Sequence, residues 1–186
     1  MGLHPSNEEL AEMARLLTKA RVENWMGEDF GSWRWWTLVM LLIVPWLIWY
    51  KLANKKHLRH LALFGMIVMV FAITLDELGF VLSLWSYPVD VIPMFPRLTS
   101  VDYTVVPIVF TLLYQYFPTW RSFFWALVAT AAIFSFIIEP LIVWMGFYKL
   151  LKWTHWASFL VYIIMGLLSR WIVRMFTDIE QKNSNT

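Results

Sequence analysis

The chain contains no cysteine among its 186 residues. This absence excludes disulfide bonds, thiol catalysis and cysteine-ligated metal centres. The sequence also lacks a strong charge of either sign, because its formal net charge is only +2 and its basic residues are scattered. We therefore expect no nucleic-acid partner, since such proteins gather positive charge to meet the phosphate backbone.

Several sequence motifs that indicate a particular enzymatic activity are also missing. The sequence has no glycine-rich phosphate loop, no HExxH zinc pair and no GxSxG nucleophile elbow. His155 with a carboxylate could in principle bind a metal, but one histidine is a weak basis, so we expect no metal and no cofactor. The first 32 residues show no continuous apolar core and no small-residue cleavage pattern. We expect the first span to act as its own insertion signal.

Hydrophobic residues, by contrast, are abundant. They form 60% of the sequence, and aromatic residues form 18%, whereas a soluble domain is about 45–50% apolar. The excess collects in runs long enough to cross a bilayer. We predict an all-α fold, a polytopic transmembrane helical bundle of about five spans in one membrane domain, 33–176. The predicted spans are residues 33–52, 58–85, 100–117, 120–147 and 153–176, and a polar tail, 177–186, is expected to fray.

The N-terminal segment, 1–32, is predicted to form an amphipathic helix ahead of the spans. Ser6 and Glu9 have the spacing of a capping box, and Leu10, Met13 and Leu17 recur at helical spacing. We expect this helix to pack against the membrane domain or to lie at the membrane interface. A docking helix for a partner protein is the alternative.

Lysine and arginine indicate the orientation. With five spans, the first and third loops lie on the side of the C-terminus, and that side carries most of the basic residues: Lys51, Lys55, Lys56, Arg59, Arg121, Arg170, Arg174 and Lys182. The positive-inside rule then predicts a cytoplasmic C-terminus in a cell-membrane protein. Basic residues in the N-terminal segment weaken this prediction.

Two adjacent carboxylates, Asp76 and Glu77, lie in the apolar stretch 66–88. Acids in a membrane helix need a partner, a cavity or water. At about 1.5 Å per residue, Asp76 lies roughly 27 Å along its span, near the outer leaflet. Glu139 lies at a similar depth on the fourth span, and Asp102 and His155 lie in the first turns of spans that start there. We predict an outward-facing ligand or proton pocket that contains Asp76, Glu77, Glu139, His155 and Tyr162.

Each of these residues also has a structural interpretation. Asp102 could simply start a helix, and Glu139 and His155 could form a structural bridge. Asp76 and Glu77 differ by about 100° around the helix, so one of them could reach the headgroups instead. Arg170 and Arg174, near the cytoplasmic end, are expected to contact headgroups by snorkelling.

Small residues predict how the helices pack, because membrane helices approach closely where side chains are small. The predicted packing seam is mostly small or polar and consists of Gly65, Ala72, Gly79, Ser83, Ala132, Ser135, Gly146 and Gly166.

The segments Leu75-Asp76-Glu77-Leu78-Gly79 and Leu84-Trp85-Ser86-Tyr87-Pro88, with Glu139, Gly146, Tyr148 and Trp153, resemble a family of small multi-pass membrane proteins from bacilli and clostridia. The resemblance implies a bacterial cell-membrane location and no particular chemistry. The chain is also faintly similar to the membrane carotenoid-cyclase domain, a small helical bundle with intramembrane acids. That domain has a proline followed closely by paired glutamates, whereas here a single Glu139 precedes Pro140.

Three functional hypotheses follow. The leading one is a non-enzymatic membrane protein that binds or moves a small polar or cationic solute, or protons, at Asp76, Glu77 and Glu139. The second is a membrane-embedded enzyme that uses one of these acids as proton donor to a lipid or isoprenoid. The third is a structural or accessory subunit, in which the seam holds a second copy or a partner protein. No inverted repeat is evident, which lowers the transport hypothesis.

Overall fold

The fold is built almost entirely from helices. The computed structural model describes residues 4–94 and 98–184. In chain order, its elements are α1 (Asn7–Asn24), η1 (Trp25–Asp29), α2 (Trp33–Leu52), η2 (Lys55–His57), α3 (Leu58–Val81), β1 (Trp85–Ser86), η3 (Val101–Val105), α4 (Val106–Tyr116), α5 (Trp120–Ile133), η4 (Phe134–Ile138), α6 (Glu139–Trp144), β2 (Lys149–Leu150) and α7 (His155–Ser184). The all-α prediction is confirmed.

Four helices are long and apolar enough to cross a membrane: Trp33–Leu52, Lys55–Val81, Trp120–Trp144 and His155–Asn183. The predicted count of five is not matched by this criterion. The predicted span 100–117 is present as η3 and α4, a shorter helical segment that would be roughly 24 Å long. This length falls short of a hydrocarbon core of about 30 Å.

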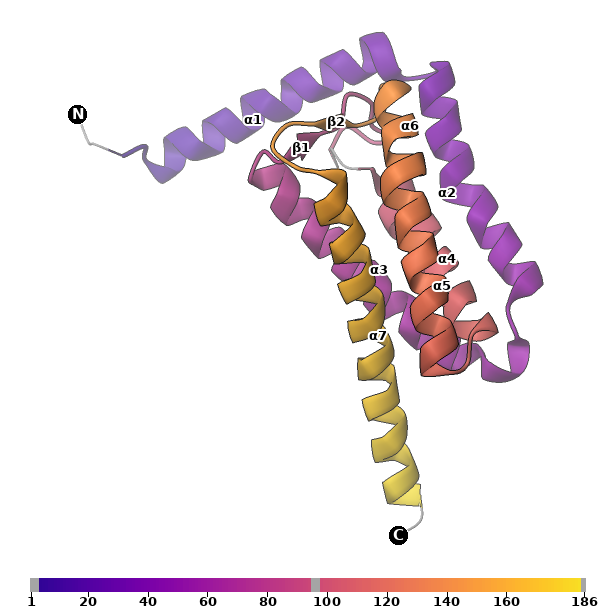
Figure 1. Cartoon of the computed structure of the whole chain (residues 1–186). Coiled ribbons are helices and arrows are strands. Elements are labelled where there is room, and N and C mark those ends of the chain that lie inside the picture. Colours follow the sequence, from indigo (N-terminus) through magenta and orange to yellow (C-terminus); the bar gives the residue numbers. More distant parts are fainter. Residues whose placement is uncertain (1–3, 95–97, 185–186) are drawn as a thin grey trace.

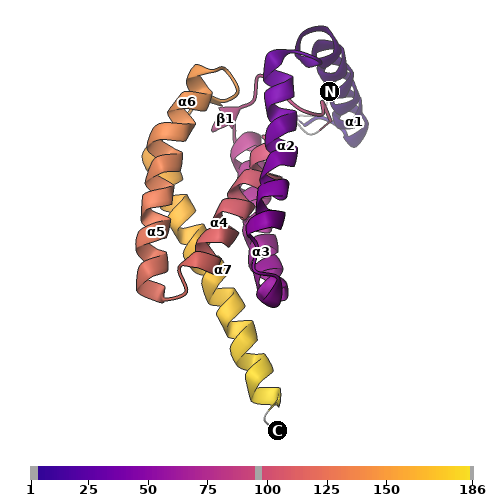
Figure 2. The same cartoon turned by 90° about the vertical axis from the view of Figure 1, so that its right-hand side faces the viewer.

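Successive helical segments run in alternate directions between two ends of the bundle (Figure 1). At one end, which we call the ribbon end, β1 pairs antiparallel with β2. At the other, the C-terminal end, lie η2, the turn between α4 and α5, and the last turns of α7 (Figures 1 and 2). The core between α3, α4, α5 and α7 is centred on Phe64, Val68, Phe110, Phe123 and Leu127.

Helix ends differ from the predictions where the backbone leaves the α conformation. The span predicted at 58–85 ends at Val81, because Ser83 has a left-handed φ of 55° and reverses the chain toward β1. The span predicted at 120–147 contains the π turn η4 and ends at Trp144. The tail predicted to fray instead continues α7 as far as Ser184.

Three glycines of the predicted seam lie where a side chain of another element packs against them: Trp85 of β1 at Gly79, Thr111 of α4 at Gly65 and Leu127 of α5 at Gly166. A Cβ atom on Gly79 would lie 2.0 Å from the Trp85 indole. A Cβ on Gly65 would lie 2.8 Å from Oγ1 of Thr111, and one on Gly166 would lie 2.7 Å from Leu127. Two further seam residues, Ala72 and Ser135, are buried as predicted.

The seam prediction is wrong at three other positions. Ser83 is exposed and belongs to the chain reversal. Gly146, with φ 79°, forms the turn after α6 and has Arg34 as its near neighbour. Ala132 is only half-buried, while the adjacent Ala131 is fully buried. Ala131 and Ser135 are buried on the segment formed by α5 and η4, so its buried face lies one residue earlier than predicted.

The N-terminal helix α1 begins with the predicted capping box. The Ser6 N–H donates to the Glu9 carboxylate at 2.7 Å, and the Glu9 N–H donates to the Ser6 hydroxyl at 3.2 Å. The helix buries no residue, and it extends sideways from the ribbon end (Figure 1). Near its C-terminal end, the guanidinium of Arg21 lies 5.8 Å from the centre of the Phe80 ring of α3. The expectation that α1 packs against the membrane domain or lies at the membrane interface stays a prediction.

Two carboxylates meet where η1 joins the loop after β1. Asp29 is buried and accepts a hydrogen bond from the backbone N–H of Asp90. The indole of Trp25 donates to the carbonyl of Asp90 at 3.0 Å, and the indole of Trp35 donates to the carbonyl of Val91 at 3.1 Å. Burial, followed by the charge of Asp29, raises the pKa of Asp90 to about 7, and Arg21 opposes this shift.

This contact should loosen as the pH rises. The folded state holds the Asp90 proton up to about pH 7, whereas an unfolded aspartate releases it near 3.8, so the favourable contribution of the proton declines between these values. We expect backbone hydrogen exchange at residues 89–91, corrected for its intrinsic pH dependence, to be faster at pH 8 than at pH 5. Asp90→Asn should abolish the difference, and Asp178→Asn, at an exposed site, should preserve it. Equal protection at both pH values in the parent would contradict the prediction.

Candidate ligand-binding cavity

A cavity of about 340 Å³ lies inside the bundle, between α3, η3–α4, η4–α6 and α7 and below the ribbon. Its walls are mostly apolar and include Ala72, Val106, Phe134 and Met165. Its polar lining consists of three carboxylates, three tyrosines, two indoles and one hydroxyl: Asp76, Asp102, Glu139, Tyr87, Tyr148, Tyr162, Trp85, Trp153 and Ser158. The sequence-predicted residues Asp76, Glu139 and Tyr162 thus share one cavity.

Asp76 is held by the segment that folds back from the end of α3. The indole N–H of Trp85 donates to its Oδ1 at 3.0 Å, and the hydroxyl of Tyr87 donates to the same oxygen. The reversal at Ser83 brings this segment back, and Gly79 leaves room for the Trp85 ring. A buried carboxylate is costly unless it is hydrogen-bonded, so these donors make the position of Asp76 tenable.

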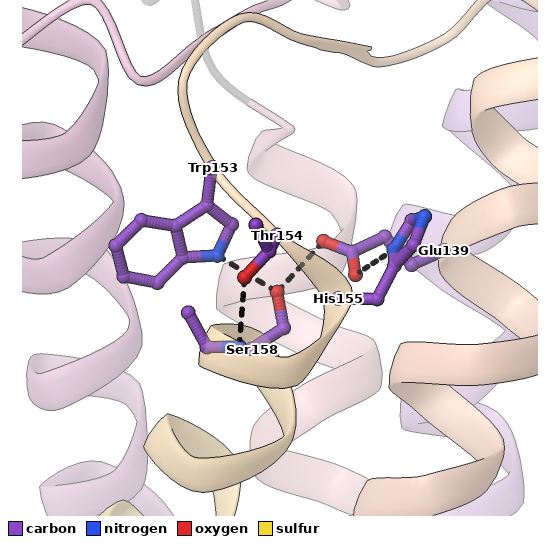
Figure 3. Close-up of polar contacts among 6 residues, drawn as sticks. Glu139, Trp153, Thr154, His155 and Ser158 are labelled. Carbon is purple, nitrogen blue, oxygen red and sulfur yellow. Dashed lines mark hydrogen bonds and ion pairs between the residues drawn. The ribbon is translucent and has the colours of Figure 1, made fainter.

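Glu139 has a second, separate set of donors (Figure 3). The hydroxyl of Ser158 donates to Oε1 at 2.9 Å, and Nδ1 of His155 lies 2.7 Å from Oε2. The indole of Trp153 donates in turn to the Ser158 hydroxyl at 2.9 Å. The predicted contact between Glu139 and His155 is therefore confirmed. The Glu139 side chain is 11% exposed and that of His155 is 33% exposed, so His155 connects a buried carboxylate with the surface.

Two π turns flank the cavity, and each ends two residues before a proline. The turn η3 ends at Val105 before Pro107, and η4 ends at Ile138 before Pro140. A proline inside a helix removes one hydrogen bond and clashes with the carbonyl four residues earlier, which the wider π turn relieves. Asp102 lies in η3 and Glu139 directly follows η4, so both acids stand where the helix has been widened.

Tyrosines in the loops of the ribbon end remain neutral donors. Burial, followed by the charge of Glu139, raises the pKa of Tyr148, which also hydrogen-bonds to that carboxylate. Asp76 contributes further to the same shift, so Tyr148 lies within electrostatic reach of both acids. Burial, followed by the charge of Asp76, likewise raises the pKa of Tyr87.

Two of the predicted assignments need correction. Glu77 is not among the described residues that line the cavity, because it lies about 100° from Asp76 around α3. Arg170 does not reach headgroups: it is buried, and its guanidinium donates to the carbonyls of Phe117 and Pro118 and lies over the Phe123 ring at 4.5 Å. It fixes the turn between α4 and α5. Arg174, by contrast, is exposed, with its Nε 4.0 Å from Asp178.

Other cavity residues were missing from the predicted site. For Asp102 the sequence favours a simple helix start, although its place at the same end of the bundle is a signal for the site. No such signal exists for Trp85, Tyr87, Tyr148 and Trp153, because they lie in the β ribbon or in the loops beside it, whose path the sequence does not determine. In residues 4–94 and 98–184, no group of three or more His, Asp and Glu side chains is placed to hold a metal ion.

No protein-family model matches the chain, and no curated protein or solved structure shows significant similarity to it. The resemblances drawn from the sequence therefore stay predictions, and function has to be argued from the cavity.

Proposed function

We propose that this chain is a multi-pass membrane protein that binds an amphiphilic molecule of the bilayer in its cavity. The observation that best supports this function is the distribution of polar groups along the cavity wall. Among the lining residues, Glu139 and Ser158 lie toward the ribbon end, whereas Met165 lies about 10 Å further along α7 from Ser158. An apolar chain would lie at the deeper end, and a cationic or hydrogen-bonding group would face the carboxylates.

The mostly apolar lining favours this function over binding of a small polar solute. Ligand sites combine hydrophobic walls with a few polar groups that fix orientation, as here. The cavity also favours ligand binding over a purely structural role for the acids, because a packing seam alone would not require an open volume of about 340 Å³ between the helices.

A second candidate function is proton donation to an unsaturated lipid or isoprenoid. The contact between partly exposed His155 and buried Glu139 supports it. In this mechanism protonated Glu139 would donate its proton to one carbon of a double bond in the cavity and leave a carbocation. The Glu139 carboxylate would then remove a proton from a neighbouring carbon, so that the double bond moves and the acid is regenerated, while His155 would hold the carboxyl group in place. General acids are effective when such a donor is positioned against the reacting group.

We further propose that η3–α4 is a fifth crossing, shortened by its π turn, and that the C-terminal end is cytoplasmic. The alternating course of the helices and the basic residues at the C-terminal end support this orientation. A cysteine at Asn54 of this cysteine-free chain should then resist an impermeant thiol reagent in intact cells; rapid labelling would reverse the orientation.

Ligand binding can be tested with two amphiphiles of equal length, dodecylamine and dodecanol. Val161 lines the cavity, so Val161→Trp should fill part of it and weaken binding of both probes at least tenfold in a fluorescence titration. Ile164→Trp, at an exposed position on the same helix, is the matched control and should bind as the parent does. Glu139→Gln should weaken binding of the cationic amine more than that of the alcohol.

Two outcomes would contradict the proposal. One is equal binding of both probes by the parent and Val161→Trp, which would place the amphiphile outside the cavity. The other is an equal effect of Glu139→Gln on amine and alcohol, which would separate the carboxylates from ligand recognition. Isomerisation of a polyene probe that is lost in Glu139→Gln would favour the second candidate function.

A further inference from the structure

A second cavity, of about 490 Å³, opens at the C-terminal end of the bundle, far from the first. It lies between the η2 turn with the first turn of α3 on one side and α7 on the other. We call it the basic groove and define it by its polar lining: Lys55, Lys56, His57, Arg59, His60, Thr177 and Glu180.

The lining of the groove has an excess of positive charge. Three of the described lining residues, Lys55, Lys56 and Arg59, are permanent cations at neutral pH and are exposed, and one, Glu180, is acidic. The α3 helix starts at the groove, and its N-cap residue, His57, makes no side-chain capping bond. The positive end of the helix dipole therefore adds to the field of the side chains.

The groove also has an apolar border on its membrane side. Leu58, Leu63 and Phe176 contribute to its lining, and Lys55 begins the 27-residue apolar segment Lys55–Val81. The Lys55 ammonium lies 4.7 Å from the centre of the Tyr50 ring, an aromatic residue of the kind that marks a membrane interface. Charge and hydrophobic surface thus meet at the level where a bilayer would begin.

We propose that the basic groove binds the phosphate headgroup of an anionic phospholipid. Basic pockets between helices at a membrane surface recognise such headgroups by charge. The apolar border favours a lipid over a free phosphate compound, because it provides a surface along which the acyl chains could run. This inference is independent of the function proposed for the first cavity.

Native mass spectrometry of the full chain, released from detergent micelles, can test the inference. The probes are phosphatidylglycerol and phosphatidylcholine with the same acyl chains, and glycerol 3-phosphate as a soluble phosphate. We expect phosphatidylglycerol to bind tightest. K55Q/K56Q should weaken its binding about fivefold for each lysine, or about 25-fold for the pair.

Two variants control this experiment. K149Q/K152Q removes two exposed lysines at the ribbon end and should bind phosphatidylglycerol as the parent does. K55R/K56R keeps the charge and should retain most of the affinity, which separates recognition from any loss of folding.

Each other result would overturn the inference. Equal binding of phosphatidylcholine, or an equal loss in K149Q/K152Q, would show that the groove does not select anionic headgroups. Glycerol 3-phosphate that binds as tightly as phosphatidylglycerol would show that the site takes a soluble phosphate instead of a lipid.

Discussion

Gly79→Ala should lower the thermal stability of the protein markedly, although it adds a single methyl group. The new Cβ would lie 2.0 Å from the Trp85 ring, far inside van der Waals contact. The ring would have to move, and its hydrogen bond to Asp76 would move with it. Overpacking of this kind typically costs about 1–3 kcal/mol. For a chain of this size we expect a melting temperature lower by roughly 3–10 °C in detergent.

Gly27→Ala is the matched control, because nothing lies within 4 Å of the corresponding Cβ position in η1. It should melt close to the parent. Trp85 gives a second readout, since its displacement should change the near-ultraviolet circular dichroism of Gly79→Ala but not of the control. Similar melting temperatures for the two variants would mean that the ribbon does not approach α3 at Gly79.

His155→Leu should destabilise the protein by removing one of the polar partners of the buried Glu139 carboxylate. Loss of one partner from a fully buried pair costs about 3–5 kcal/mol, and we expect about 1–3 kcal/mol here because His155 is a third exposed. In Glu139→Gln/His155→Leu the charge is removed too, so the double variant should be more stable than the two single effects predict. His4→Leu, at an exposed position, should have no effect.

Thermal melts of the parent, the two single variants and the double variant form a thermodynamic cycle. A coupling of at least about 1 kcal/mol would support a pair that acts as a unit. Strictly additive effects would mean that Glu139 depends on Ser158 and Tyr148 and not on His155. The same variants allow infrared titration of the carboxyl bands, in which a shift of the Asp76 band upon Glu139→Gln would show that the two acids titrate together.

The sequence predicted features that depend on local order or on helix geometry alone. Ser6 and Glu9 are three residues apart, so their capping box follows from spacing. The convergence of Asp76, Glu139 and His155 at one end of the bundle follows from counting residues along antiparallel helices. The close approach at Gly79 could also be predicted, because a small residue on a polar helix face suggests a near neighbour.

Other features depend on chain path, which the sequence did not reveal. The reversal at Ser83 has neither glycine nor asparagine to signal a positive φ, and without it neither Trp85 nor Tyr87 could be placed on Asp76. The contact between Asp29 and Asp90 joins residues far apart in the chain. A π turn is wider than an α turn, so it rotates the residues on its two sides relative to the positions expected for a regular α-helix. For this reason the prediction placed Ala132 on the buried face, whereas Ala131 is the buried residue.

The burial of Arg170 shows a further limit of reading charge alone. An arginine near the end of a membrane span, where the sequence predicted Arg170, ordinarily extends its side chain to the headgroups. Here Arg170 donates to the carbonyls of Phe117 and Pro118 instead. These carbonyls are free to accept because the helical hydrogen bonding ends at the turn that contains Pro118, between α4 and α5. Arg170 is therefore buried because the carbonyl groups of a turn that is distant in sequence accept its hydrogen bonds.

The uninterrupted helix α7 connects the two ends of the molecule as one rigid element. The helix runs from His155 to Ser184 with no proline and no π turn, in contrast to the two interrupted segments beside it. His155 at the first cavity and Glu180 at the basic groove are about 37 Å apart along this rod. A tilt of about 5° around one end would move the other by about 3 Å, roughly half a helical turn. A tilt of α7 caused by binding at one site would therefore change the position of the α7 residues at the other site.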